Sequence, residues 1–200
     1  MYLKYFVGGV NGVGKTTLLK AIAEARPEFL VLRLSEHLMK WLGIPGDYDA
    51  LRALSQEYKR EQVPLCLERL LEDNQDRSIL VDTHYLNTIN GEITVVTDEW
   101  LSRFDALVMI TAPTVDVIRR IDNDPARDRA LFKPDETDKY AFIEHYQALT
   151  KQEFDRQARD CDVPSLVIHH RHHNTAMAVT DFLHFHERVL VGAQKAHSPA

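Results

Sequence analysis

Residues Gly9 to Thr16 constrain the fold of this chain more than any other stretch. They read Gly-Val-Asn-Gly-Val-Gly-Lys-Thr and match the phosphate-binding pattern G-x-x-x-x-G-K-[ST]. Tyr2–Val7 before them is an apolar, β-prone run, and Thr17–Ala25 after them carries apolar residues on one helical face. A strand, a glycine loop and a helix in this order point backbone N–H groups at phosphate oxygens. The sequence therefore predicts a site for a nucleotide or a related polyphosphate.

Each part of this loop has a predicted contact. The Lys15 ammonium is expected to reach the β- and γ-phosphates, and the Thr16 hydroxyl to ligate Mg²⁺. The glycines allow a tight turn and a close approach of the backbone to the ligand. The residues expected to bind the nucleotide are Gly9, Asn11, Gly12, Val13, Gly14, Lys15, Thr16 and Thr17. The alternative interpretation is a glycine turn that binds nothing.

Apolar runs alternate with helical patterns along the rest of the chain. Beyond the first run, strands are predicted at residues 29–34, 78–81, 105–110 and 165–168. Because these runs are almost continuously apolar, they indicate an α/β fold with a parallel sheet that helices cover on both faces. Helices are predicted at residues 51–73, which Pro64 should kink or divide, and at residues 175–189.

The domain organisation follows from this alternation. One domain is expected over residues 1–190, with two insertions over the phosphate end of the sheet at about residues 35–60 and 122–139. Residues 191–200 are expected to form a flexible tail.

Composition and charge exclude several classes of protein. The chain has 200 residues and a net charge of −6, so it lacks the general basic field that would hold a nucleic acid. Cys66 and Cys161 have no metal-ligand spacing, which indicates a reducing compartment. No stretch resembles a signal peptide or a membrane span. We expect a soluble, cytoplasmic protein whose partner is a small molecule.

Asp82 is the second chemical signal, since it ends the apolar run Ile79-Leu80-Val81. Ligands of parallel sheets bind at the carboxyl ends of the strands. A carboxylate there is expected to belong to the magnesium site, although it could merely end a strand. His84, two residues later, is placed to contact the acceptor.

Four arginines form the third signal. Arg119, Arg120, Arg127 and Arg129 surround a polar stretch that Pro125 interrupts. Arginine forks suit phosphate oxygens, and a hinged loop that closes them over the substrate would exclude water. The alternative is a solvated turn in which these arginines pair with neighbouring aspartates.

Other candidates carry less information. Arg52 could grip an acceptor's phosphate or be an ordinary exposed helix residue, and Arg33 is interpreted as structural. For a hydroxyl acceptor, a general base would be needed, and Glu36, Asp82 and His84 are the candidates. The cluster of histidines at residues 169–173 could contact a nucleotide base, hold a metal or form a polar loop.

The glycine loop, the Asp82-Thr83-His84 sequence and the arginine-rich stretch occur together and in order. This combination resembles the archaeal-type adenylate kinases, within the nucleoside-monophosphate kinases of the P-loop NTPase superfamily. The resemblance implies a three-layer fold with a five-stranded parallel sheet, an acceptor-binding insertion at about 35–60 and a lid at about 122–139. It implies transfer of the γ-phosphoryl group from Mg·ATP to AMP, and also a homo-oligomer.

The resemblance also assigns roles to single residues. Lys15 and Thr16 would hold the donor phosphates and Mg²⁺, with Asp82 in the magnesium shell. Arg127 and Arg129 would be lid arginines, and Arg119 or Arg120 would flank the lid hinge near the adenine. Arg52 stands where the family has an arginine for the acceptor phosphate.

Three departures from the family pattern concern the site. Asn11 replaces a common proline, residues 85–92 lack the glycine- and proline-rich run beside the acceptor, and Ala130 replaces an aspartate. The acceptor therefore stays open between AMP and a related nucleotide or nucleoside. The alternative functions are a P-loop ATPase that acts as a switch or assembly factor, and a nucleotide-sensing module with little turnover.

Overall fold

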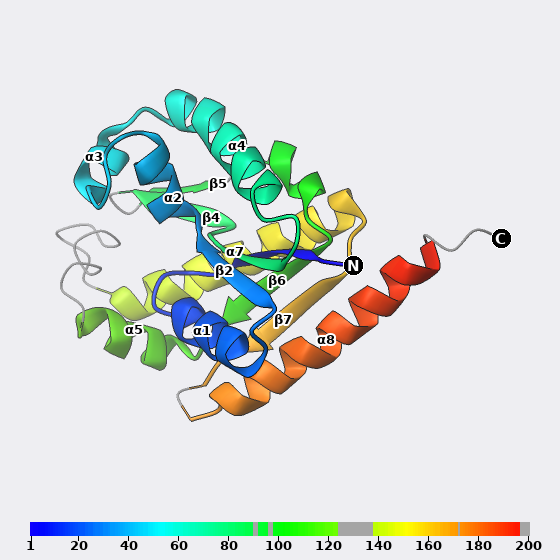
Figure 1. Ribbon diagram of the computed structural model, residues 1–200. Coiled ribbons are helices and arrows are strands. Elements are labelled where there is room, and N and C mark those ends of the chain that lie inside the picture. The colour runs from blue at the N-terminus through cyan, green and yellow to red at the C-terminus, as the bar shows by residue number, and fades with distance from the viewer. Residues whose placement is uncertain (90–91, 96–97, 124–137, 172, 197–200) are drawn as a thin grey trace.

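Five strands form a parallel sheet at the centre of the molecule (Figure 1). They are β1 (Lys4–Gly8), β2 (Phe29–Arg33), β3 (Ser78–Asp82), β6 (Ala106–Thr111) and β7 (Ser165–His169). Their order is β2-β3-β1-β6-β7, and every neighbouring pair is parallel. The computed structural model describes residues 1–89, 92–95, 98–123, 138–171 and 173–196. The predicted five-stranded parallel sheet is confirmed.

Helices cover both faces of this sheet. One face carries α1 (Lys15–Ala25), α5 (Thr114–Asp122) and α8 (Thr175–Ala196), and the other carries α2 (Leu34–Trp41) and α4 (Gln56–Glu72). The long helix α7 (Lys139–Cys161) contributes to the cores on both sides. Side chains alternate along a strand, so Tyr5 and Val7 of β1 enter one core and Phe6 enters the other. The three-layer arrangement is therefore confirmed.

The helical region after β2 breaks at a different place from the one predicted. The short helix α3 (Tyr48–Ala53) ends before Ser55, whose hydroxyl accepts a hydrogen bond from the Tyr58 N–H at 3.1 Å. This side-chain cap starts α4, and Pro64 lies inside that helix. Near the chain's end, α8 continues past residue 189 to Ala196, so the first part of the expected tail is helical.

A hairpin that the sequence analysis did not predict follows β3. It consists of β4 (Leu86–Ile89) and β5 (Glu92–Val95), which pair antiparallel, and the 3-10 helix η1 (Asp98–Arg103) comes next. Buried Tyr85 anchors its base, because its hydroxyl donates to the Val108 carbonyl at 3.0 Å.

The second predicted insertion falls mostly outside the described residues. Its two flanks meet, because Lys139 Nζ lies 2.9 Å from the Asp122 carboxylate. Arg127, Arg129 and Ala130 belong to the part that the structure does not describe.

Among the helices in the described ranges, none combines the length and the apolar character needed to cross a membrane.

Candidate functional site

The glycine loop connects the central strand β1 to the first turn of α1. Gly14 caps that helix with a φ of 93°, in the left-handed region, and its carbonyl accepts from the Leu18 N–H at 3.1 Å. The helix begins at Lys15, so its first N–H groups lie beside the loop. The strand–loop–helix arrangement predicted from the sequence is present.

Lys15 folds back over this loop and is buried. Its Nζ donates to the Gly9 carbonyl at 2.8 Å and to the Val10 carbonyl at 3.3 Å. The Nδ1 atom of His84 lies 3.5 Å from the same Nζ and 3.1 Å from the Gly9 oxygen. The structure thus brings His84 to the phosphate loop. Its expected contact with the acceptor stays a prediction.

Asp82 lies next to Thr16, the other polar end of the loop. The Thr16 hydroxyl donates to the Asp82 carboxylate at 3.4 Å. A hydroxyl and a carboxylate are hard oxygen donors of the kind that Mg²⁺ prefers. In the described part of the chain, no group of three His, Cys, Asp or Glu side chains could hold a metal. A magnesium ion here would therefore also need water and phosphate oxygens as ligands.

A charged group lies beside Asp82 at the same edge of the sheet. Arg33, at the end of β2, is the register partner of Asp82 and forms a 2.6 Å ion pair with Glu36. The hydrogen bond with Glu36 raises the pKa of the Arg33 guanidinium, and the charge of Asp82 adds to this effect. Arg33 was expected to be structural, and its pairing with Glu36 was not predicted from the sequence.

Two side chains from distant elements hold carbonyl groups of the glycine loop. Arg120 Nη1 donates to the Gly12 carbonyl at 3.0 Å, and His170 Nδ1 lies 3.2 Å from the Val13 carbonyl. Burial lowers the pKa of the Arg120 guanidinium, and the charge of neighbouring Arg119 also lowers it. The resemblance placed Arg119 or Arg120 beside the lid hinge near the adenine. Arg120 contacts the loop itself, and a contact with the adenine stays a prediction.

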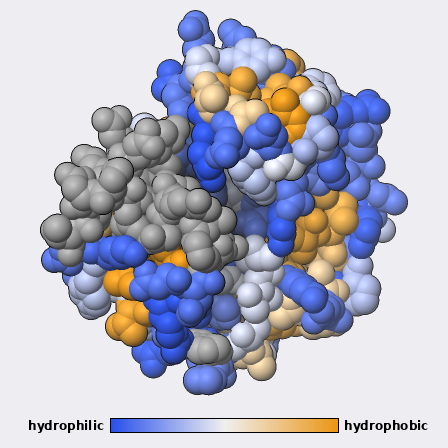
Figure 2. All heavy atoms as spheres, turned by 90° about the vertical axis from the view of Figure 1, so that its left-hand side faces the viewer, coloured by the Kyte–Doolittle hydropathy of each residue, from blue (hydrophilic) through white to orange (hydrophobic). Residues whose placement is uncertain are grey.

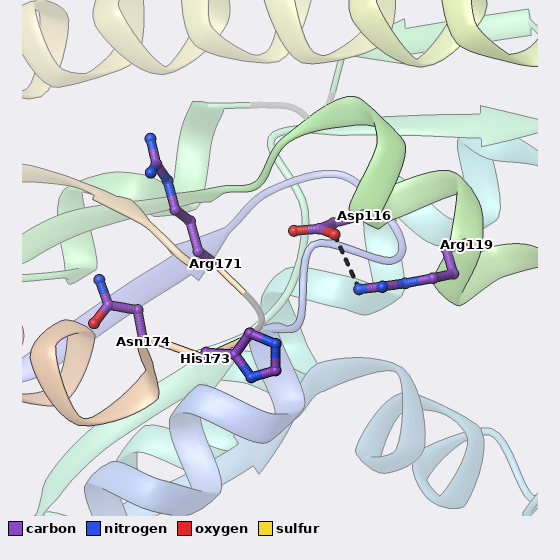
Figure 3. A pocket seen from close by; sticks show the side chains of 5 residues that line it. All are labelled: Asp116, Arg119, Arg171, His173 and Asn174. Atoms are coloured by element: carbon purple, nitrogen blue, oxygen red, sulfur yellow. Dashed lines mark hydrogen bonds and ion pairs between the residues drawn. The ribbon is translucent and has the colours of Figure 1, made fainter.

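A pocket of about 420 Å³ opens between α5 and the segment that follows β7. Asp116 and Arg119 come from α5 and form an ion pair at 2.9 Å. Figure 3 shows this pair facing the residues of the other segment. The residues that line the pocket are Asp116, Arg119, Arg171, His173 and Asn174.

The pocket joins two candidates that were far apart in the sequence. The resemblance placed Arg119 or Arg120 near the adenine, and contact with a base was one of three interpretations of the histidines at residues 169–173. Arg119 and His173 both line this pocket. Asp116 was not predicted from the sequence, although it lies one helical turn before Arg119 on α5.

Arg52 stands apart from these groups. It lies on α3, which Figure 1 shows well away from α1 and its preceding loop. Its guanidinium forms an ion pair with Asp49 on the same helix, and about half of the side chain is exposed. The structure does not bring Arg52 to the phosphate loop.

Several solved structures with a similar fold are kinases by name. A shikimate kinase from Bacteroides thetaiotaomicron is 16% identical, with a TM-score of 0.59, over 92% of this chain and 98% of that chain. A shikimate kinase from Acinetobacter baumannii, solved with shikimate, is 12% identical (TM-score 0.60; 100% and 97% covered). A gluconokinase from Sinorhizobium meliloti 1021 is 16% identical (TM-score 0.54; 98% and 97% covered).

At these identities the likeness shows a shared fold alone, and it does not single out the archaeal-type adenylate kinases. No curated protein sequence matches the chain significantly. Residues 8–137, more than half of the chain, match a family model described as an AAA domain, and the chain therefore belongs to that family.

Proposed function

We propose that this chain is a small-molecule kinase that transfers the γ-phosphoryl group of Mg·ATP to AMP or to a related nucleotide or nucleoside. The observation that carries the proposal is the meeting of Thr16 with Asp82, 3.4 Å apart, beside the buried Lys15. A phosphoryl-transfer site needs a cation for the donor phosphates and oxygen ligands for magnesium. Lys15 supplies the cation at the end of the glycine loop. Thr16 and Asp82, which ends the neighbouring strand β3, supply the oxygen ligands.

In this proposal, the donor ATP would bind along the glycine loop and in the pocket beside it. Its phosphates would follow the glycine loop, and its base would enter the pocket between Arg119 and His173. Mg²⁺, held through Thr16 and Asp82, would supply positive charge at the donor phosphates. Lys15 would leave the Gly9 and Val10 carbonyls and donate to the phosphate oxygens instead.

The acceptor would lie at the carboxyl edge of β2 and β3. On the face of the molecule that carries α3 and α5, blue hydrophilic residues outnumber orange hydrophobic ones among those that are not grey (Figure 2). This surface suits a polar acceptor. AMP or another phosphate acceptor is ionised at neutral pH and needs no strong base, whereas a hydroxyl acceptor would need Glu36, Asp82 or His84 as the base.

The kinase proposal is tested with Mg·ATP and a panel of acceptors. The panel contains AMP and other nucleoside monophosphates, nucleosides, and the hydroxy acids shikimate and gluconate, after which the similar structures are named. We expect one class of acceptor to raise ADP formation, and Lys15→Ala to abolish that rise. Lys20→Ala is the matched control, since the Lys20 side chain is 77% exposed on the same helix.

Two results would count against the proposal. If no acceptor raises ADP formation above the rate measured with Lys15→Ala, the kinase proposal is wrong. Slow ATP turnover that needs no acceptor and rises with a protein partner would favour the ATPase function instead.

A cytoplasmic location, where ATP is abundant and thiols stay reduced, accords with the proposed reaction.

A further inference from the structure

His170 is buried between the glycine loop and the start of α8. Its side chain is 3% exposed, although it follows directly after the edge strand β7. Its backbone N–H donates to the Thr111 carbonyl at 2.7 Å, which continues the pairing of β7 with β6. The ring then lies against Gly14, since a Cβ atom on that glycine would come within 2.5 Å of the ring Nδ1.

The two ring nitrogens of His170 have different partners, and these determine the tautomer. Nδ1 lies 3.2 Å from the Val13 carbonyl, and Nε2 lies 3.1 Å from the Thr175 hydroxyl. A carbonyl oxygen can only accept, so Nδ1 carries the proton and donates to Val13. In the neutral ring Nε2 is then an acceptor, and the Thr175 hydroxyl donates to it.

The hydrogen bond to Val13 fixes the direction of a loop amide. The Val13 carbonyl and the Gly14 N–H belong to one peptide group, and no peptide bond in the described residues is cis. In a trans peptide the C=O and N–H point in opposite directions. Holding the carbonyl toward His170 therefore turns the Gly14 N–H away from that ring.

Arg120 acts on the preceding peptide group in the same way. Its 3.0 Å hydrogen bond holds the Gly12 carbonyl and so orients the Val13 N–H. Two successive peptide planes are thus held from outside the loop by side chains from α5 and from the segment after β7.

We propose that His170 is a positioning residue for phosphate binding, which holds the Val13 carbonyl and thereby aims the Gly14 N–H at the donor phosphates. The inference rests on the proposed function only in requiring that phosphates bind at this loop. It assigns His170 a role distinct from that of the residues after it, which line the pocket for the base.

The test compares two amides that each replace one ring nitrogen. The amide nitrogen of Asn stands at the same number of bonds from Cβ as Nδ1, and that of Gln at the same number as Nε2. His170→Asn can therefore keep the donor to Val13, whereas His170→Gln cannot place a donor there without displacing the loop. The ligands are magnesium tripolyphosphate, which has no base, and Mg·ATP, both titrated calorimetrically.

We expect His170→Gln to weaken the binding of both ligands by roughly five- to tenfold, the effect of one hydrogen bond. His170→Asn should remain within about twofold of the unchanged protein. Thr175→Val removes the partner of Nε2 and should also remain within about twofold. Thermal melting of each variant shows that it is folded before its affinity is compared.

Three outcomes would overturn the inference. The first is equal affinity of the His170→Asn and His170→Gln variants for the ligands. The second is a loss of affinity in Thr175→Val as large as that in His170→Gln. The third is a loss of affinity in His170→Gln for Mg·ATP but not for magnesium tripolyphosphate. Tripolyphosphate binding without phosphorylation of any acceptor would defeat the kinase proposal and leave the His170 comparison intact. A protein that binds neither ligand would defeat both.

Discussion

At the residue scale, Gly14 meets two separate demands. Its φ of 93° is in the left-handed region, where a side chain is strained. It also has no room for a Cβ atom, because His170 Nδ1 would lie 2.5 Å away. Gly43 has a φ of 73° and nothing within 4 Å of the same position, so it meets only the first demand.

We therefore expect Gly14→Ala to reduce stability more than Gly43→Ala does. The backbone strain alone should cost about 1–2 kcal/mol in Gly43→Ala. Gly14→Ala should cost about 1–3 kcal/mol more, from the overpacking against His170. Urea unfolding of both variants measures the difference, and equal losses would show that the contact with His170 does not restrict this position.

His186 is a buried titratable group far from the glycine loop. Its Nδ1 lies 2.6 Å from the Tyr5 hydroxyl within an aromatic cluster, and the side chain is 6% exposed. Burial lowers the pKa of His186 below its ordinary value of about 6.5, and the charge of Arg26 lowers it further. Glu28 and Glu187 act in the opposite direction but do not outweigh these effects.

This lowered pKa predicts a loss of stability in acid. Below about pH 6.5 the unfolded chain binds a proton at His186 that the folded chain resists. The contribution of the neutral ring to stability is therefore fully present above that pH. It is lost as the pH falls from about 6.5 through the lowered pKa, at no more than about 1.4 kcal/mol per pH unit.

Substituting His186 by Gln should make stability less dependent on pH, because Gln stays neutral. Urea unfolding at a series of pH values between about 8 and 5 gives the free energy for both proteins. We expect the unsubstituted protein to lose more stability than His186→Gln over this range. Two parallel curves would exclude His186 as the cause.

At the scale of elements, α4 contains an unfavourable residue. Pro64 has no N–H to give to the carbonyl of Arg60, and its ring crowds that carbonyl. The helix nevertheless continues on both sides, because Leu67 and Leu71 are buried against the sheet and Ser55 caps the beginning. Packing and the cap therefore outweigh the local penalty.

Pro64→Ala should stabilise the protein by about 1–2 kcal/mol. The restored hydrogen bond favours the helix, and the greater freedom of the unfolded chain offsets part of the gain. Leu65→Ala, at an adjacent position that is 50% exposed, should change stability by less than about 1 kcal/mol. Thermal and urea unfolding measure both variants, and a destabilised Pro64→Ala would contradict this view of α4.

The elements that sequence reasoning predicted are those whose signals are local. The strands are apolar runs long enough to be recognised, and Asp82 stands at the end of one of them. The break at Ser55 was missed because the proline was given more weight than the serine cap. The hairpin was missed although Asn90-Gly91, a dipeptide typical of tight hairpin connections, stands between its strands.

The residues of the candidate site also differ in whether a local sequence pattern marks them. Lys15 and Thr16 belong to the recognisable glycine motif, and Asp82 and His84 lie at or just after the end of β3, so their meeting could be expected. The partners of Arg120 and His170 lie 108 and 157 positions away in the sequence. Such contacts depend on which face of α5 turns to the loop and on where β7 joins the sheet, which no local pattern specifies.

At the scale of the whole molecule, a bound nucleotide should raise the melting temperature. Mg·ATP at one hundred times its dissociation constant adds about 2.7 kcal/mol to the folded state. For a chain of this size that corresponds to roughly 5–10 °C. We expect Lys15→Ala to lose this rise while Lys20→Ala keeps it, as followed by calorimetric melting. An equal rise in all three proteins would place the bound nucleotide elsewhere.

The hold of His170 on the Val13 carbonyl has a consequence for synthesis. The glycine loop is synthesised before β7 and the start of α8, since 157 positions separate Val13 from His170. A nascent chain that lacks them contains the whole phosphate-binding motif but not the side chain that orients its Gly14 amide. If His170 positions this amide, nucleotide binding should tighten by roughly five- to tenfold once β7 has joined the sheet.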